Sequence, residues 1–345
     1  MKRRILLAVL DWGLGHASRM VPVVEALREL GCKLSMASSG QALEYLRNRY
    51  PDLPSHELPA PRIRYGRWGA SWGLFRHSLS QKRWNRKQQE WIRSMQNRHS
   101  FDAIISDNLY GVYHRNVPSV LVSHQLHLLS PVFRKSINKE LGHWLNNFDQ
   151  IWVPDVEEGL ADGLTHNPFC EKPIQHIGPL SRLKPLDDAE CKYRAVALIS
   201  GPEPQRSFFE EACQQHLNQL DGPTAMVRGL PHLRDAPSGK KGQCEQFAFL
   251  DDAQLTRLLL SADYVICRSG YSTLCDLSAL GCRALLVPTP GQPEQLYLAG
   301  RCAEMKWFQS SSHRELKYRE EVSADFQPPQ FSRFDLQGFL RQWIG

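Results

Sequence analysis

The chain has 345 residues, 42% of them hydrophobic and 23% charged, which is more than one hydrophobic core usually serves and is typical of a two-domain globular protein. Its mean hydropathy is −0.42 and its longest apolar run covers residues 5–10, which excludes a membrane-spanning helix of about 20 apolar residues. The run follows basic residues as in a signal peptide, but Asp11 ends it below the roughly 7 to 15 residues that such a peptide needs. We therefore expect a cytoplasmic protein.

Strand and helix patterns alternate through the first half of the chain. Apolar runs predict strands over residues 5–10, 33–37, 103–106, 119–123 and 150–153. The clearest helix is predicted over residues 18–30, where apolar side chains recur at helical spacing before Gly31. This alternation is typical of a parallel sheet with crossover helices, and a first domain is expected over residues 1–177.

One segment of this domain carries the positive charge of the chain. Residues 62–98 contain ten Lys or Arg and one acidic side chain, which gives +9, whereas the whole chain is +6 and the remainder is therefore net negative. Trp68, Trp72, Trp84 and Trp91 lie between the basic residues. Two interpretations are open: a surface for lipid headgroups or phosphorylated ligands, or a solvated helix with core tryptophans. Nucleic acid is not an expected partner, because no recognition motif accompanies the charge.

A second α/β series follows a turn-rich linker over residues 178–190. It is predicted to contain strands at 195–200, 224–227, 246–249, 264–267 and 284–287 and helices at 205–220, 253–260, 272–280 and 294–304. These elements define a second domain over residues 191–328. Residues 329–345 end in a helix with one apolar face, which we expect to return to the first domain. The predicted fold class is α/β, with two Rossmann-like, doubly wound domains.

The turn after the first strand contains candidate site residues. Ligands of open parallel sheets bind at the carboxyl ends of the strands. Gly13 and Gly15 lack side chains there and permit close approach of a ligand. His16 lies in the same turn, and its ring can take up a proton near neutral pH. With Arg19, which follows one helical turn later, these residues are candidates for the acceptor side of an active site.

Two other strands of the first domain end in polar residues. Asp107 ends one of them, where it could orient the ring of His16 as in a base-plus-orienter pair; the alternative is that Asp107 only caps the following turn. His124 and Gln125 follow the next strand and would face the same cleft. No metal is expected, because the pair of His124 and His127 lacks Cys or acidic partners at a metal-site spacing.

The strand ends of the second domain carry residues suited to a phosphorylated sugar. A polar loop with Gly201 follows the first of its strands and could cradle a phosphate. Another strand leads into a helix whose positive end gathers a cation, hydroxyls and backbone amides, as a diphosphate requires. The residues concerned are Arg268, Ser269, Gly270, Ser272 and Asp276. A rigid loop then presents Glu294 and Gln295, which are able to bind sugar hydroxyls.

These residues resemble a known family. Four stretches of the second domain resemble the donor-binding domain of MurG-type glycosyltransferases. They are residues 249–252 (Phe-Leu-Asp-Asp), residues 267–270 (Cys-Arg-Ser-Gly), Asp276 and residues 288–295. Those enzymes are family 28-like, use UDP-N-acetylglucosamine and have the GT-B fold of two Rossmann-like domains. The string Ser-Gly-Pro-Glu-Pro-Gln-Arg that begins at Ser200 is closest to an uncharacterised group of bacterial glycosyltransferase-like proteins.

The resemblance implies a role for each matching residue. The backbone at Leu250 would read the uracil, Ser269 and Gly270 would hold the diphosphate, and Asp276 would bind the ribose. Glu294, which stands where the family has an amide, and Gln295 would contact the donor sugar.

The expected function is transfer of a hexose or N-acetylhexosamine from a UDP-sugar to an acceptor hydroxyl, with inversion and without a metal, because no Asp-x-Asp pair occurs in the chain. The UDP-sugar is a co-substrate, and no cofactor is expected. The acceptor is expected to be lipid-linked or phosphorylated, with the basic segment 62–98 against an anionic membrane at its inner face.

Three alternatives are open. The turn Gly-x-Gly-His-x-x-Arg also resembles the UDP-sugar hydrolase of pseudaminic acid synthesis, in which water replaces the acceptor. The others are a sugar-nucleotide epimerase of the same fold and a catalytically silent protein that binds sugar nucleotides or lipid headgroups. The basic segment favours transfer, because hydrolysis of a small soluble donor needs no cationic aromatic surface.

Overall fold

The computed structural model describes residues 2–59, 73–130, 132–186, 190–233, 235–316 and 322–345. Two compact units divide the chain: the first runs to Leu180 and resumes at Ser332, and the second lies between Ser181 and Phe331. Each unit is built on its own sheet.

The first unit contains a parallel sheet. Its strands are β1 (Arg4–Val9), β2 (Lys33–Ser38), β3 (Ser55–Glu57), β4 (Ala103–Asp107), β5 (Ser119–Val122), β6 (Gln150–Val153) and β7 (Ile174–His176). They run in the order β3-β2-β1-β4-β5-β6-β7, with each neighbouring pair parallel. The order reverses between β1 and β4, and the loops after these two strands therefore flank the point where ligands bind in such sheets.

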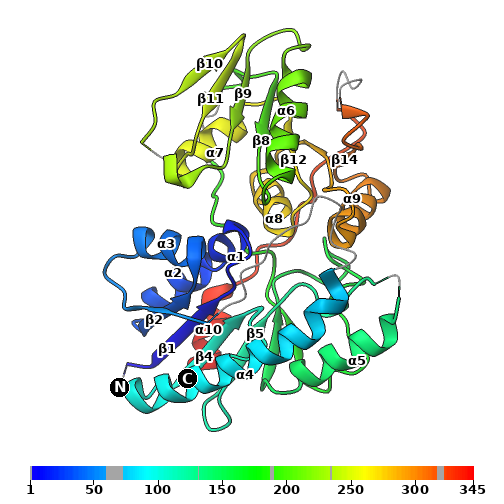
Figure 1. Cartoon of the computed structure of the whole chain (residues 1–345). Coiled ribbons are helices and arrows are strands. Elements are labelled where there is room, and N and C mark those ends of the chain that lie inside the picture. The colour runs from blue at the N-terminus through cyan, green and yellow to red at the C-terminus, as the bar shows by residue number, and fades with distance from the viewer. Residues whose placement is uncertain (1, 60–72, 131, 187–189, 234, 317–321) are drawn as a thin grey trace. The chain divides into compact units, whose positions relative to one another are not determined.

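Helices cover both faces of this sheet (Figure 1). They are α1 (Leu14–Arg19), α2 (Val21–Glu29), α3 (Gly40–Arg49), α4 (Gly73–His99), α5 (Arg134–Leu145) and α10 (Leu336–Ile344). Alternate residues of β1 explain the layers, because successive side chains of a strand point to opposite faces. Ile5 and Leu7 pack with α2 and α10, whereas Leu6 and Ala8 pack with Ile92 of α4.

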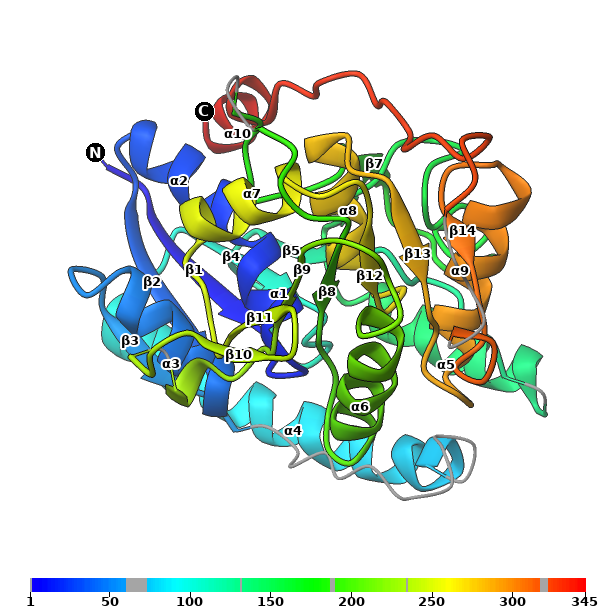
Figure 2. The same cartoon turned by 90° about the horizontal axis from the view of Figure 1, so that it is seen from above.

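The last helix completes the core of the first unit. α10 lies beside α2, as Figure 2 also shows, and its Phe339 and Trp343 rings pack against buried Trp152 at centroid distances of 5.0 and 4.9 Å. Gly178 allows the chain to pass close by, because a Cβ there would lie 2.6 Å from the Cβ of Phe334. The apolar face of the terminal helix is thus covered, as its sequence predicts.

The second unit has the same kind of sheet. Its strands are β8 (Ala195–Leu198), β9 (Thr224–Val227), β10 (Gly239–Lys241), β11 (Cys244–Phe247), β12 (Val265–Cys267), β13 (Ala284–Leu286) and β14 (Gln309–Ser310). They run in the order β10-β11-β9-β8-β12-β13-β14. Within the described residues, β10 and β11 are antiparallel and the other neighbouring strands are parallel. The helices are α6 (Gln205–Leu217), α7 (Asp252–Leu260), α8 (Tyr271–Leu280) and α9 (Pro293–Glu304). The order reverses between β8 and β12.

The prediction of two Rossmann-like α/β halves is confirmed. The single helix predicted over residues 18–30 is wrong in detail, because the structure divides it into α1 and α2 at Met20. Pro22 is the reason, since it lacks an N–H and is tolerated only in the first turn of a helix, where it lies in α2. Among the described helices, none is both long and apolar enough to cross a membrane.

The basic segment forms a long helix over most of its described length. Residues 73–98 belong to α4, whereas Trp68 and Trp72 lie outside the described residues. Trp91 packs against the core of the first unit, which favours the interpretation of this tryptophan as core rather than as a surface anchor. Trp84 is partly buried, and the ammonium group of Lys87 lies 4.6 Å from the centre of its ring.

Candidate active site

The structure brings His16 and Asp107 into contact. His16 lies on α1, directly after β1, and Asp107 is the last residue of β4, the neighbour of β1. The His16 Nδ1 atom is 2.6 Å from the Asp107 Oδ2 atom, and the histidine side chain is 15% exposed while the aspartate is fully buried. A carboxylate holds Nδ1 in its protonated form, which leaves Nε2 of the same ring able to accept a proton.

Arg19 is the centre of this polar cluster. Its guanidinium donates from Nε to Asp107 Oδ1 at 2.8 Å and from Nη1 to His124 Nδ1 at 2.8 Å, and Nη2 also contacts Asp107. Arg19 and His124 are only 2% and 5% exposed. Both residues, expected on the acceptor side, are thus buried, and Arg19 links His124 to the pair of His16 and Asp107.

The charge of Asp107 depends on its neighbours. Burial raises the pKa of this carboxyl, but the positive charges of Arg19 and His16 and their hydrogen bonds outweigh burial and hold the pKa below its usual range. The carboxylate therefore stays ionised at neutral pH and can stabilise a positive charge that develops on His16. This is the electrostatic arrangement that a general base requires.

The other acceptor-side residues lie on the loops beside this pair. Gly13 precedes α1 with φ of +74°, a left-handed conformation that favours glycine. Gly15 is partly exposed, and its carbonyl accepts a hydrogen bond from Ser18 Oγ at 3.1 Å. Gln125 is partly exposed, and its backbone N–H donates to Ser123 Oγ. Gly15 and Gln125 are thus partly accessible, while the backbone groups named here are bonded within their own loops.

Two residues near the pair were missed by sequence analysis. Asn108 follows Asp107 with φ of +54°, and its side-chain Oδ1 is buried without a hydrogen-bond partner among the described residues. Asp11 follows β1, and its Oδ1 accepts from the backbone N–H of Ala42 at 3.1 Å, so it fixes the start of α3. Their position directly after β1 and β4 is the signal that could have identified them.

In the second unit, a charged side chain of the loop after β8 pairs with the first turn of α6. Gly201 is exposed with φ of +109°. The Glu203 carboxylate accepts from the backbone N–H of Ser207 at 3.2 Å, from Ser207 Oγ at 2.7 Å and from Arg206 Nε at 2.6 Å. A carboxylate of the chain itself therefore caps the start of α6, where sequence analysis expected a cradle for phosphate.

Arg268 lies inside the second unit. It is 2% exposed; its Nη1 donates to the carbonyls of Val287 and Pro288 at 3.1 Å and its Nη2 to the carbonyl of Gln205 at 3.2 Å. The guanidinium carbon is 4.1 Å from the ring centre of Phe209. Burial lowers the pKa of Arg268 to about 10, so it remains charged at neutral pH. Arg268, expected at the diphosphate, thus joins the loops after β12 and β13 to α6 through backbone carbonyls.

The loops after β12 and β13 are also joined through Ser269 and Gln295. Ser269 is fully buried, and its Oγ donates to the Gln295 carbonyl at 2.8 Å. The Gln295 side chain accepts from the backbone N–H of Thr289 at 2.8 Å. Gly270 and Ser272 at the start of α8 are partly exposed, as are Glu294 at the start of α9 and Leu250 before α7. The residues at these helix starts, rather than Ser269, are accessible to a ligand.

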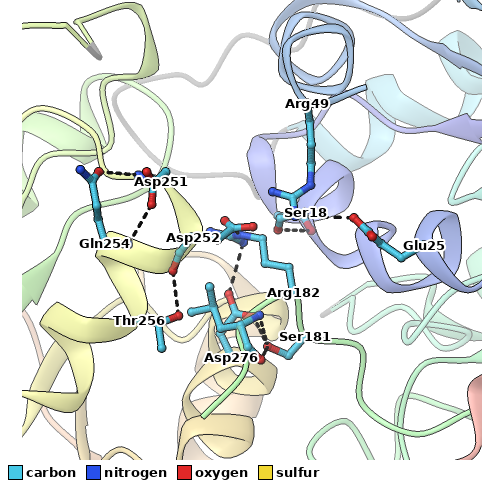
Figure 3. A network of polar contacts seen from close by, with 12 residues as sticks. Ser18, Glu25, Arg49, Ser181, Arg182, Asp251, Asp252, Gln254, Thr256 and Asp276 are labelled. Carbon is cyan, nitrogen blue, oxygen red and sulfur yellow. Dashed lines mark hydrogen bonds and ion pairs between the residues drawn. The ribbon is translucent and has the colours of Figure 1, made fainter. Parts of the chain in front are cut away.

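Asp276 takes part in a network with the first residues of the second unit (Figure 3). Its Oδ1 accepts from Ser181 Oγ at 2.6 Å and its Oδ2 from Arg182 Nη1 at 3.3 Å. Arg182 also donates from Nε to Asp252 Oδ1 at 2.6 Å. Sequence analysis identified Asp276 but missed Ser181 and Arg182, which lie in the segment predicted as a linker.

Comparison with known proteins agrees with the resemblance found in the motifs. Residues 231–313 match the family described as the glycosyltransferase family 28 C-terminal domain. A UDP-N-acetylglucosamine–N-acetylmuramyl-(pentapeptide) pyrophosphoryl-undecaprenol N-acetylglucosamine transferase of Paraburkholderia xenovorans is 36% identical over 97 residues, which is 28% of this chain and 23% of that relative. An uncharacterized glycosyltransferase of Methanopyrus kandleri is 22% identical over 91% of this chain and 95% of its own length.

Solved structures support the fold over nearly the whole chain. The spinosyn rhamnosyltransferase complexed with thymidine diphosphate is similar with a TM-score of 0.62 and 14% identity, covering 99% of this chain and 100% of that chain. MurG of Acinetobacter baumannii is similar with a TM-score of 0.56 and 15% identity, covering 92% and 89%. The chain has the GT-B fold, and its second unit carries a domain that resembles family 28 glycosyltransferases; both predictions are confirmed.

Proposed function

We propose that this chain is a glycosyltransferase that moves a hexose or N-acetylhexosamine from a UDP-sugar to an acceptor hydroxyl, with inversion and without a metal. The observation that carries the proposal is the contact of His16 with buried Asp107 at the switch point of the first unit, in a chain whose second unit matches a glycosyltransferase domain. The match supports sugar transfer, and the histidine is proposed as the base for that transfer.

His16 is the proposed general base. With Nδ1 against Asp107, Nε2 takes the proton of the acceptor hydroxyl while the hydroxyl oxygen attacks the anomeric carbon and the bond to the diphosphate breaks. Asp107 stabilises the imidazolium that forms, and Arg19 keeps Asp107 ionised. A single displacement of this kind inverts the anomeric configuration.

The donor is proposed to bind to the second unit. Nucleotides bind to doubly wound sheets at the carboxyl ends of the strands and at the starts of the helices that follow. The residues in these positions are Gly201, Leu250, Gly270, Ser272 and Asp276 with its network. The start of α8 supplies the positive helix end for the diphosphate. Glu294 and Gln295 at the start of α9 are proposed to contact the donor sugar.

The identities of donor and acceptor are proposed from the relatives. The Paraburkholderia relative is named for UDP-N-acetylglucosamine and for a pyrophosphoryl-undecaprenol acceptor, whereas the spinosyn enzyme was solved with thymidine diphosphate. A pyrimidine nucleoside diphosphate is common to both names. We favour UDP because the Paraburkholderia relative is 36% identical over 97 residues, whereas the spinosyn enzyme is 14% identical.

The donor proposal is tested by a thermal-shift screen of UDP-, TDP-, GDP- and ADP-sugars, each with and without EDTA. UDP and one or more UDP-sugars are expected to raise the melting temperature, since a ligand at about 100 times its Kd adds about 2.7 kcal/mol of stability. EDTA should leave the shift unchanged. A shift that disappears with EDTA would contradict the metal-free site, and a larger shift with TDP would replace the donor.

The same samples distinguish transfer from hydrolysis. The parent is incubated with the UDP-sugar that gives the largest shift, first without an acceptor and then with a lipid-linked acceptor such as undecaprenyl diphosphate-linked saccharide. Transfer predicts UDP release that depends on the acceptor. Rapid release of free sugar without an acceptor would instead support the hydrolase alternative.

We propose that the exposed side of α4 meets an anionic membrane or a lipid-linked acceptor. Lys82, Arg83, Arg86 and Lys87 are all exposed on adjacent turns of this helix. Lys82 pairs with Glu140 of α5 at 3.1 Å, and just before α5 the side chains of Val132 and Phe133 are 58% and 65% exposed. Exposed cations beside exposed apolar groups are typical of a surface that binds lipid headgroups reversibly.

Flotation with vesicles tests this surface. The parent should float with vesicles that contain anionic lipid, less so as salt is added, because the attraction is screened over about 8 Å at physiological ionic strength. The triple variant Arg83→Glu, Arg86→Glu and Lys87→Glu should bind about 100-fold more weakly or worse, since each basic residue contributes about 1 kcal/mol.

A matched control distinguishes an effect of charge on α4 from an effect of the total charge of the protein on vesicle binding. The variant Lys240→Glu, Lys241→Glu and Arg257→Glu changes three exposed cations of the second unit by the same total charge. It should float almost as the parent does. Equal recovery with neutral and anionic vesicles, or an equal loss in both triple variants, would contradict the proposed surface.

A further inference from the structure

The carboxylate of Asp276 lies within a set of contacts that fixes its position. Asp276 is in the middle of α8 and is 9% exposed. Ser181 Oγ donates to Oδ1 at 2.6 Å, a shorter contact than its 3.3 Å to the Leu183 carbonyl, and the same Oγ accepts from the backbone N–H of Leu183 at 3.1 Å. Arg182 Nη1 donates to the other oxygen, Oδ2. Both oxygens of the carboxylate are therefore held (Figure 3).

Arg182 bridges two helices of the second unit. Its Nε donates to Asp252 at the start of α7 at 2.6 Å and its Nη1 donates to Asp276 of α8 at 3.3 Å. The side chains of all three residues are largely buried, at 17%, 23% and 13% exposed. One guanidinium thus lies between two carboxylates, and without it two negative charges would face each other in a site with little water.

The charge of Asp276 is the result of opposing effects. Burial raises its pKa above the usual range and Asp252 acts in the same direction, while the charge of Arg182 and the hydrogen bond from Ser181 oppose them. Arg182 is the only one of these neighbours that contributes a positive charge. Loss of Arg182 would leave desolvation and the repulsion from Asp252 without a positive counterpart.

We propose that Ser181 and Arg182 are positioning residues for Asp276, which keep its carboxylate ionised and aligned so that it can accept hydrogen bonds from the ribose hydroxyls of the donor. This inference rests on the proposed function, because it assigns the nucleotide to Asp276. An ionised carboxylate accepts stronger hydrogen bonds than a protonated one. A carboxylate oxygen also accepts more than one hydrogen bond, so a ribose hydroxyl can bind beside Ser181 or Arg182.

The test measures UDP affinity against pH by calorimetry in the parent, Arg182→Met and Arg182→Lys. In Arg182→Met, Asp276 should be protonated over a wider pH range, so that UDP binds about tenfold more weakly at neutral pH, which corresponds to about 1.4 kcal/mol. The deficit should shrink as the pH rises above neutral, because the carboxyl ionises again at higher pH. Arg182→Lys retains the positive charge and should restore most of the affinity.

Two further measurements separate a positioning role from a structural one. Arg257→Met removes an exposed cation of α7 and should leave both affinity and pH profile unchanged. The carboxyl carbon resonance of Asp276, assigned by its loss in Asp276→Asn, should titrate at higher pH in Arg182→Met than in the parent. A deficit that is equal at every pH, or an unchanged titration of Asp276, would overturn the proposal. If the parent binds no UDP while the titration still moves, the proposed donor is wrong and the control of Asp276 by Arg182 stands.

Discussion

Replacement of His16 by alanine should lower turnover by roughly 10² to 10⁴-fold while the affinity for UDP stays nearly unchanged. In the described structure, the His16 imidazole contacts the buried carboxylate of Asp107, with 2.6 Å between Nδ1 and Oδ2. Its removal eliminates proton transfer in the transition state. The donor is proposed to bind to the other unit, and UDP affinity should therefore not depend on this ring.

The measurement pairs steady-state transfer with calorimetric UDP binding. His166→Ala is the matched control, because His166 is an exposed histidine of the same unit, and it should retain the parent's turnover. If His16→Ala stays within a few-fold of the parent, the base lies elsewhere. His124, the histidine expected to face the same cleft, is poorly suited to replace it, because its Nδ1 already accepts a hydrogen bond from Arg19 and the residue is 5% exposed.

The alternation of strands and helices could be predicted from sequence because parallel strands are buried on both faces. Residues 5–10 form a continuous apolar run, and residues Ile5 to Val9 of the resulting strand are at most 1% exposed. Edge strands lack this signal. β10 consists of Gly239–Lys241, which are all exposed, and β7 covers Ile174–His176, of which the middle residue is exposed and the other two are partly exposed. Each has a single neighbour, so no apolar pattern marks it.

The contact of His16 with Asp107 could be anticipated only in part. Each residue follows a predicted strand, but their proximity depends on β1 and β4 being neighbours although residues 33–57 supply two strands between them in sequence. Proximity is thus a property of the strand order. The sequence marks the ends of strands, and the doubly wound topology then determines which ends meet.

The arginines show where sequence reasoning fails for physical reasons. Arg19 and Arg268 resemble ligand-binding cations in sequence, but both are at most 2% exposed. Arg268 is satisfied by the carbonyls of Val287, Pro288 and Gln205, which are backbone groups with no signature in the side-chain sequence. Burial of a charged side chain depends on such partners, and they are visible only in the folded chain.

Substitution of Arg19 by methionine should destabilise the first unit by about 3 to 5 kcal/mol at neutral pH, because it leaves the buried carboxylate of Asp107 without its main counter-charge. Asp107 is fully buried and accepts two of its hydrogen bonds from this guanidinium. Methionine fills a similar length without charge, so the loss reports the unpaired charge more than a cavity. Amide hydrogen exchange of peptides from β1 and β4 measures the local stability of this unit.

The pH dependence of the loss identifies its cause. In the parent, the pKa of Asp107 is lowered, so its contribution to stability is present above the unfolded value of about 3.9 and is lost as the pH falls through the folded value. In Arg19→Met, burial should dominate and raise this pKa. Protonation then favours the folded state, and the deficit relative to the parent should shrink as the pH falls from about 7 toward about 5.

The double variant Arg19→Met, Asp107→Asn provides the matched control. Asparagine has nearly the shape of aspartate but no charge, so the double variant should recover a large part of the stability that Arg19→Met loses, and the deficit that remains should no longer depend on pH in this range. Equal stability of the single and double variants would contradict the assignment. Because the double variant also lacks the carboxylate that holds the ring of His16, turnover should not recover with stability, and stability is the readout that identifies the unpaired charge.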